Sequence, residues 1–149
     1  MKRFFSRRAV SLVAALSLVF LVACKSDNPT SGDPANTGSI SGTVTFTAGT
    51  WPASGDVQVA VYSSLPPSGP PDGYTNPLNG ATDYPTYNYK ISGLDPGTYD
   101  GVIVVWRDPS NVLSSKQIGI YSGGMPVVIE KGKTATGFDI DADLTQAGP

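Results

Sequence analysis

Residues 38–47 read GSISGTVTFT, and every second position of this stretch is apolar or glycine. In a β-strand, successive side chains point to opposite faces, so this alternation predicts a strand with one buried and one solvated face. The buried face carries Ile40, Val44 and Phe46, and the other face carries serine and threonine. The stretch therefore predicts the first strand of a β-sheet.

Six later stretches carry strand patterns of the same kind. They are residues 57–62, 87–92, 102–106, 116–121, 127–130 and 138–144. Residues 102–106 are apolar throughout, which is typical of a strand buried on both faces and places Trp106 in the core. Glycine (17 residues) and proline (13 residues) interrupt the chain so often that no helical spacing is sustained. This pattern predicts an all-β domain over residues 38–145, an antiparallel β-sandwich of about seven strands, with residues 146–149 as a tail.

The most specific turn lies in residues 91–99, which read ISGLDPGTY. In its Asp-Pro-Gly sequence the proline presets its own φ angle, and the glycine accepts a positive φ. We therefore expect a tight reversal here, with Leu94 and Tyr99 covering one end of the core.

Three stretches, GSISGTV (38–44), VQVAVY (57–62, with Val57 first) and GLDPGTY (93–99), resemble the carboxypeptidase regulatory-like domains. These are transthyretin-related, prealbumin-like sandwiches, and the resemblance spans about residues 38–144. It implies a seven-stranded sandwich that serves as an accessory, adhesive or spacer module. Two departures are visible. Residues 63–85 are longer than the usual loop, and the chain has no histidine, whereas enzymatic relatives such as the hydroxyisourate hydrolases use histidines.

The N-terminus has the pattern of a secretion leader. Residues 1–8 carry four cations and no acid, and an apolar run follows over residues 9–23. A membrane-spanning helix needs about 20 apolar residues, and this run is shorter. Charged and short apolar segments in this order predict a signal peptide over residues 1–23.

The end of that leader, Leu21-Val22-Ala23-Cys24, resembles the lipobox of bacterial lipoproteins. The resemblance implies cleavage before Cys24 and a diacylglycerol on its sulfur, where two or more acyl chains give durable anchoring. A plain signal peptide with an incidental cysteine is the alternative. Cys24 is the only cysteine, so no disulfide forms within the chain. Residues 24–37 read as the lipidated cysteine and a flexible tether.

Charge narrows the range of partners. The leader removes four of the ten cations and none of the twelve acids, so the mature chain has six cations and a charge of −6. An acidic chain is unsuited to nucleic acid, which needs a basic face, and lacks attraction to anionic lipid. Lys25 follows the lipidated cysteine, where aspartate would be the retention signal in many enteric bacteria. In a cell with two membranes, this favours the outer membrane, with the domain facing the periplasm or the cell surface.

The residue inventory argues against an enzyme. Zero histidines and one committed cysteine exclude Ser-His-Asp and Cys-His nucleophiles and histidine-bearing zinc sites. Glycosidase chemistry needs two carboxylates about 5–9.5 Å apart across a cleft, and the sequence nominates no such pair. We therefore expect no catalytic residues and no cofactor beyond the lipid on Cys24.

Asp139, Asp141 and Asp143 alternate along the last predicted strand. Alternate Cα atoms on a strand lie about 6.8 Å apart with parallel side chains, whereas calcium needs six to eight oxygens at about 2.3–2.6 Å. We interpret these aspartates as a charged strand face rather than a metal site.

The candidate ligand-binding residues lie in and near the long segment 63–85. This segment is rich in proline and carries Tyr74 and Tyr84, and Trp51 lies in the preceding connection. Such aromatic faces on a stiff loop can bind a sugar or a partner peptide. Alternatively, residues 66–71 cover an open sheet edge and the tyrosines cap the core.

Three functions stay open on the sequence alone. The leading hypothesis is a non-enzymatic, membrane-tethered β-sandwich that acts as an accessory or binding module of the cell envelope. The second is a glycan- or peptide-binding surface protein that uses the loop aromatics. The third is a structural spacer or subunit of a larger envelope complex with an envelope protein as its partner.

Overall fold

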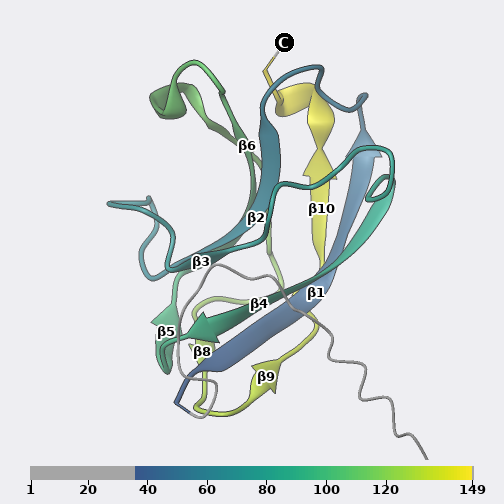
Figure 1. The fold of residues 1–149 in the computed structure, drawn as a ribbon. Coiled ribbons are helices and arrows are strands. Elements are labelled where there is room, and N and C mark those ends of the chain that lie inside the picture. The colour runs from purple at the N-terminus through teal and green to yellow at the C-terminus, as the bar shows by residue number, and fades with distance from the viewer. Residues whose placement is uncertain (1–35, 149) are drawn as a thin grey trace, which may run out of the picture.

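A computed structural model describes residues 36–148 of the chain (Figure 1). The predicted leader, the predicted lipid attachment at Cys24 and the tether up to residue 35 lie outside the described residues. Within residues 36–148, regular structure consists of strands and two 3-10 helices of three residues each. None of this described part is a helix long and apolar enough to cross a membrane.

Two sheets hold these strands. The larger sheet contains β1 (Gly38–Ala48), β2 (Asp56–Tyr62), β3 (Gly73–Tyr74), β4 (Thr86–Leu94), β6 (Gly101–Arg107), β7 (Lys116–Ile120), β9 (Thr134–Ala135) and β10 (Ile140–Asp143). The smaller sheet pairs β5 (Gly97–Tyr99) with β8 (Val127–Ile129). The 3-10 helices are η1 (Val112–Ser114) and η2 (Leu144–Gln146). The predicted all-β fold is confirmed, and each of the seven predicted stretches contains a strand.

The strand order of the larger sheet is β3-β2-β6-β7-β10-β1-β4, with β9 also paired to β1. The prediction of a wholly antiparallel arrangement is wrong for β1, which pairs in parallel with β10 and with β9. These partners come from opposite ends of the domain. Their direction is therefore not constrained by the short hairpin turns that make neighbouring strands antiparallel.

The larger sheet curls so that its two terminal strands meet (Figure 1). Gly73 of β3 lies against the side chains of Ile91 and Leu94 of β4, and a Cβ atom on this glycine would be 2.7 Å from Leu94 Cδ2. Only a residue without a side chain fits at this approach. The curl encloses the core, which is built mainly from the inward faces of β1, β2, β4, β6 and β10.

The residues that the sequence placed in the core are buried there. Leu94, Tyr99 and Trp106 are each at most 5% exposed. The Tyr99 hydroxyl donates to the carbonyl of Asp95 at 2.7 Å, which closes the Asp-Pro-Gly turn. Trp106 Nε1 donates to the carbonyl of Ser54 at 2.9 Å, so the polar edge of this buried ring is satisfied.

We predict that Gly42→Ala lowers the free energy of unfolding by about 1–3 kcal/mol. A Cβ atom at Gly42 would overlap the backbone carbonyl of Phe138, which precedes β10. Urea unfolding measures the change. Gly69→Ala is the matched control, because nothing lies within 4 Å of a Cβ atom there, and it should change stability by less than about 0.5 kcal/mol. Equal effects of the two substitutions would contradict this close approach of β1 to Phe138.

Candidate functional site

A groove of about 330 Å³ lies on the face of β2 and β6 that is turned away from the core. On β2, Val57, Val59 and Val61 face the core, so the alternate residues face the groove. We call it the tyrosine groove, and it is lined by Gln58, Ala60, Tyr62, Pro70, Pro71, Tyr74, Val105, Arg107 and Ser115.

One wall of the tyrosine groove is the segment that returns along β2. Backbone N–H groups of Asp72, Thr75 and Leu78 donate to the carbonyls of Val61, Val59 and Val57, respectively, at 2.8–2.9 Å. The segment predicted as a loop over residues 63–85 therefore contains β3 and covers the open edge of β2. Two of its prolines, Pro70 and Pro71, line the groove.

The floor of the groove contains a buried polar side chain, Gln58, which is 4% exposed. Gln58 Nε2 donates to the carbonyl of Thr75 at 2.9 Å, and Gln58 Oε1 accepts a hydrogen bond from Arg107 Nη1 at 2.9 Å. The Thr75 hydroxyl in turn accepts from the N–H of Val59 at 3.1 Å. This network joins the exposed Arg107 to the floor by one hydrogen bond, and the buried amide would be destabilised if it lost either partner.

Arg107 supplies the positive charge of the groove. Among residues 36–148, no carboxylate oxygen lies within 4.0 Å of its guanidinium. Burial raises the pKa of Tyr62, the nearby charge of Arg107 partly offsets that rise, and Asp72 adds to it. Tyr62 is therefore a neutral phenol at physiological pH and can donate or accept a hydrogen bond.

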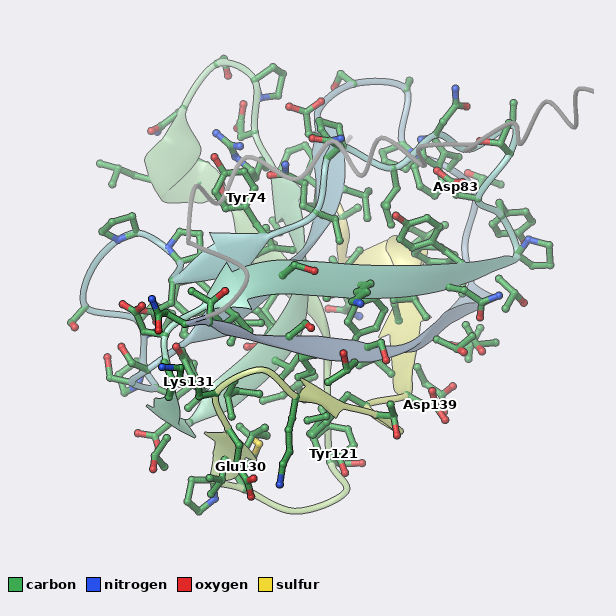
Figure 2. The ribbon with its side chains drawn as sticks, turned by 60° about the horizontal axis from the view of Figure 1, so that its bottom comes forward. Tyr74, Asp83, Tyr121, Glu130, Lys131 and Asp139 are labelled. Atoms are coloured by element: carbon green, nitrogen blue, oxygen red, sulfur yellow. The ribbon has the colours of Figure 1, made fainter. Side chains whose placement is uncertain are left out.

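Two of the three aromatic residues singled out from the sequence lie together, away from the groove. The ring of Phe46 meets Trp51 edge-on, with centroids 5.4 Å apart, and stacks on Tyr84 at 6.2 Å. Phe46 is buried, whereas Tyr84 is 45% exposed. We call Phe46, Trp51 and Tyr84 the aromatic cluster. Tyr74 lies instead in the tyrosine groove, and Figure 2 shows it well apart from Asp83, the neighbour of Tyr84 in sequence.

A compact loop supports the aromatic cluster. Gly80 packs directly on the indole ring of Trp51, leaving no space for a Cβ atom. The loop is closed by Asp83, whose carboxylate accepts from the N–H of Asn79 at 2.6 Å. Burial, with a smaller contribution from Asp83, raises the pKa of the neighbouring Tyr87.

Two of the three aspartates of the last predicted strand, Asp139 and Asp143, make hydrogen bonds with different parts of the chain. The carboxylate of Asp139 accepts from the N–H of Thr43 at 2.8 Å, and that of Asp143 accepts from the N–H of Thr145 at 2.9 Å, which caps η2. Hydrogen bonds from Thr145 hold the pKa of Asp143 below its ordinary value. In the described part of the chain, no group of three acidic, histidine or cysteine residues is close enough to hold a metal ion.

Sequence reasoning singled out Tyr74 but not three residues that line the groove with it, Gln58, Tyr62 and Arg107. The alternation of β2 did place Gln58 and Tyr62 on the face opposite the valines. The missing information was which segment covers that face, since this depends on the return of residues 72–78 along β2.

We predict that Trp51→Ala lowers the free energy of unfolding by about 2–3 kcal/mol, because its ring packs on Phe46 and Gly80. Tyr84→Ala, at a more exposed position, should cost less than about 1 kcal/mol. Thermal and urea unfolding of the two variants gives the comparison. If Trp51→Ala leaves stability unchanged, the indole is not part of the packing, and a binding role for it gains support.

Two surfaces thus carry the aromatic residues selected from the sequence, and they differ in character. The aromatic cluster is held mainly by ring packing, whereas the tyrosine groove combines aromatic faces with a hydrogen-bonded amide and a guanidinium. Comparisons with protein-family models, with curated proteins and with solved structures find no match for this chain.

Proposed function

We propose that this chain is a lipid-anchored, non-enzymatic binding module of the cell envelope that holds a glycan segment in the tyrosine groove. The observation that carries the proposal is the composition of the groove. Tyrosine and proline provide flat faces, and Tyr62, Ser115 and Arg107 provide hydrogen-bonding groups, with Arg107 joined to the buried Gln58 below. A volume of about 330 Å³ falls in the range of small-molecule sites, about 300–1,000 Å³.

A glycan suits this composition for a physical reason. A pyranose ring has an apolar C–H face and a rim of hydroxyl groups, so it uses aromatic packing and directional hydrogen bonds together. The residues lining the groove include no aspartate, glutamate, histidine or cysteine. They therefore offer recognition without a group suited to acid–base or nucleophilic chemistry at neutral pH, which supports a binding role.

The anchoring part of the proposal rests on the sequence. The leader over residues 1–23 and the lipobox ending at Cys24 support lipidation of that cysteine. Residues 25–37 can extend by at most about 45 Å, enough to hold the domain clear of the lipid headgroups. Lys25 after the lipidated cysteine supports an outer-membrane destination in a cell with two membranes.

We also propose that the domain is a divergent carboxypeptidase regulatory-like, transthyretin-related β-sandwich. Two of the stretches that carry the resemblance support this assignment by their location. GSISGTV lies within β1, and GLDPGTY covers the passage from β4 to β5. The strands that follow β1 in the chain, β2, β3 and β4, all belong to the curled larger sheet.

The binding function predicts different outcomes for the half-buried Tyr74 and the exposed Tyr84. In affinity electrophoresis through gels with embedded peptidoglycan fragments, alginate or galactan, the protein should be retarded by at least one glycan. Tyr74→Ala should abolish that retardation, because Tyr74 lines the groove, and Tyr84→Ala should leave it intact. Both variants should retain thermal stability. Absence of retardation in every glycan, or equal loss in both variants, would exclude the groove as a glycan site.

The anchor predicts a second outcome. In cells grown with labelled palmitate, the native protein should carry the label and sediment with outer membranes, whereas Cys24→Ala should be unlabelled and leave the membrane fraction. Two or more acyl chains, at about 0.8 kcal/mol per buried CH2, account for the difference. Sedimentation of Cys24→Ala with membranes at the native level would show that something other than a lipid holds the protein there.

A further inference from the structure

Arg107 is the only arginine after the leader and the one charged residue among residues 36–148 that line the tyrosine groove. It is the last residue of β6, in register with Asp56 at the start of β2. Even so, its guanidinium lies beyond ion-pair distance of every carboxylate in the described part of the chain. A guanidinium in a groove, with no carboxylate within ion-pair distance, is suited to an anion from outside.

The side chain of Arg107, an exposed residue, donates a hydrogen bond to the buried amide of Gln58. That hydrogen bond, 2.9 Å from Nη1 to Oε1, uses one of the guanidinium N–H groups and leaves others for a ligand. Because Gln58 is itself held by Thr75, the arginine is held before a ligand arrives. Less conformational entropy is then lost on binding than for a freely rotating surface arginine.

The strand register aligns the other groove residues with this charge. Gln58 pairs with Val105, so Arg107 lies two residues further along the same face of β6. Tyr74 of β3 pairs with Ala60 of β2, and Tyr62 lies two residues beyond Ala60 along β2. A ligand lying along β2 would therefore meet the guanidinium at one end and the tyrosines beyond it.

We propose that the tyrosine groove binds a carboxylated sugar, a uronic acid unit of a glycan, with Arg107 binding the carboxylate and Tyr62 and Tyr74 contacting the ring. This rests on the proposed function and names its ligand class. The planar guanidinium matches the two oxygens of a carboxylate in a bidentate arrangement.

The single charge of the groove favours a uronic acid over other anions. The four lysines of the described residues, Lys90, Lys116, Lys131 and Lys133, do not line the groove. One cation suits a ligand with a single carboxylate per ring and neutral hydroxyls around it. A polymer with several sulfates or phosphates per unit would be repelled by the acidic chain, because the groove has no second cation to bind the additional charges.

A peptide fits the same groove less well. An extended peptide binds by adding a strand to a free sheet edge, where backbone hydrogen bonds provide affinity. The strand that borders the groove, β3, has only two residues. The polar groups that the groove offers are side-chain hydroxyls and a guanidinium, which complement the hydroxyls and carboxylate of a uronic acid.

The test uses the full chain purified in detergent and isothermal titration with trisaccharides of galacturonic acid and of mannuronic acid. Each is compared with its methyl ester, which keeps the rings and removes the charge. We expect the protein to bind at least one acid about tenfold or more tightly than its ester. Arg107→Gln should weaken binding of the acid to the level of the ester. Lys133→Gln, an equal charge change at an exposed residue paired with Glu130, should have no effect.

Three results would overturn the inference. One is equal binding of acid and ester by the native chain, another is unchanged affinity in a folded Arg107→Gln variant, and the third is tighter binding of an acidic peptide than of either trisaccharide. Arg107→Lys, which keeps the charge but not the planar fork, should lie between the native chain and Arg107→Gln. A mixed result separates the two proposals. If Tyr74→Ala abolishes glycan retardation but the acid and its ester bind equally, the uronic acid inference fails and the proposed glycan-binding function stands.

Discussion

Burial of both faces of β6 is the constraint on which the tyrosine groove depends. Val102 and Val104 lie in the core, while Ile103, on the opposite face, is only 2% exposed. A strand that is apolar on both faces needs cover on both, because each exposed apolar face would cost free energy in proportion to its area. The core covers one face. Over the other face, the proline-rich segment after β2 places Leu65 against Gly101 of β6, and Pro70 and Pro71 line the groove beside Val105. Backbone hydrogen bonds hold this segment to β2. The tyrosine groove is the space that this cover leaves open.

The sequence predicted the parts of the fold that local patterns encode. Alternation located the seven main strand stretches, and the pattern of residues 91–99 placed Leu94 and Tyr99 correctly in the core, although the positive φ lies at Gly93 and not at Gly97. The strands that it missed, β3, β5 and β9, have two or three residues, too few for alternation to register. The parallel pairing of β1 with β10 was also missed, because residues almost a hundred positions apart select each other through tertiary packing and not through a local turn.

The candidate site was predictable only in part, for the same reason. Tyr74 and Tyr84 stand out in a proline-rich segment, yet closeness in sequence does not place them together. Trp51 and Tyr84 both pack on Phe46 of β1. Tyr74 instead pairs with Ala60, which places it on the side of β2 that faces away from the core. Gln58 read as an ordinary solvent-facing residue of an alternating strand. It organises the groove only because Thr75, which follows β3, and Arg107, the last residue of β6, both form hydrogen bonds with its amide.

The pairing of β1 on both of its sides has a mechanical consequence. Gly38, the first residue of β1, directly follows the segment interpreted as the tether, and β1 is hydrogen-bonded to β4 along one edge and to β9 and β10 along the other. Hydrogen bonds of this kind run across the strands, so a pull along β1 loads many of them together in shear rather than one after another. Rupture under such a load is governed by the rate of unfolding and not by equilibrium stability. The two-sided pairing of β1 therefore lets the domain resist a pull applied at Gly38.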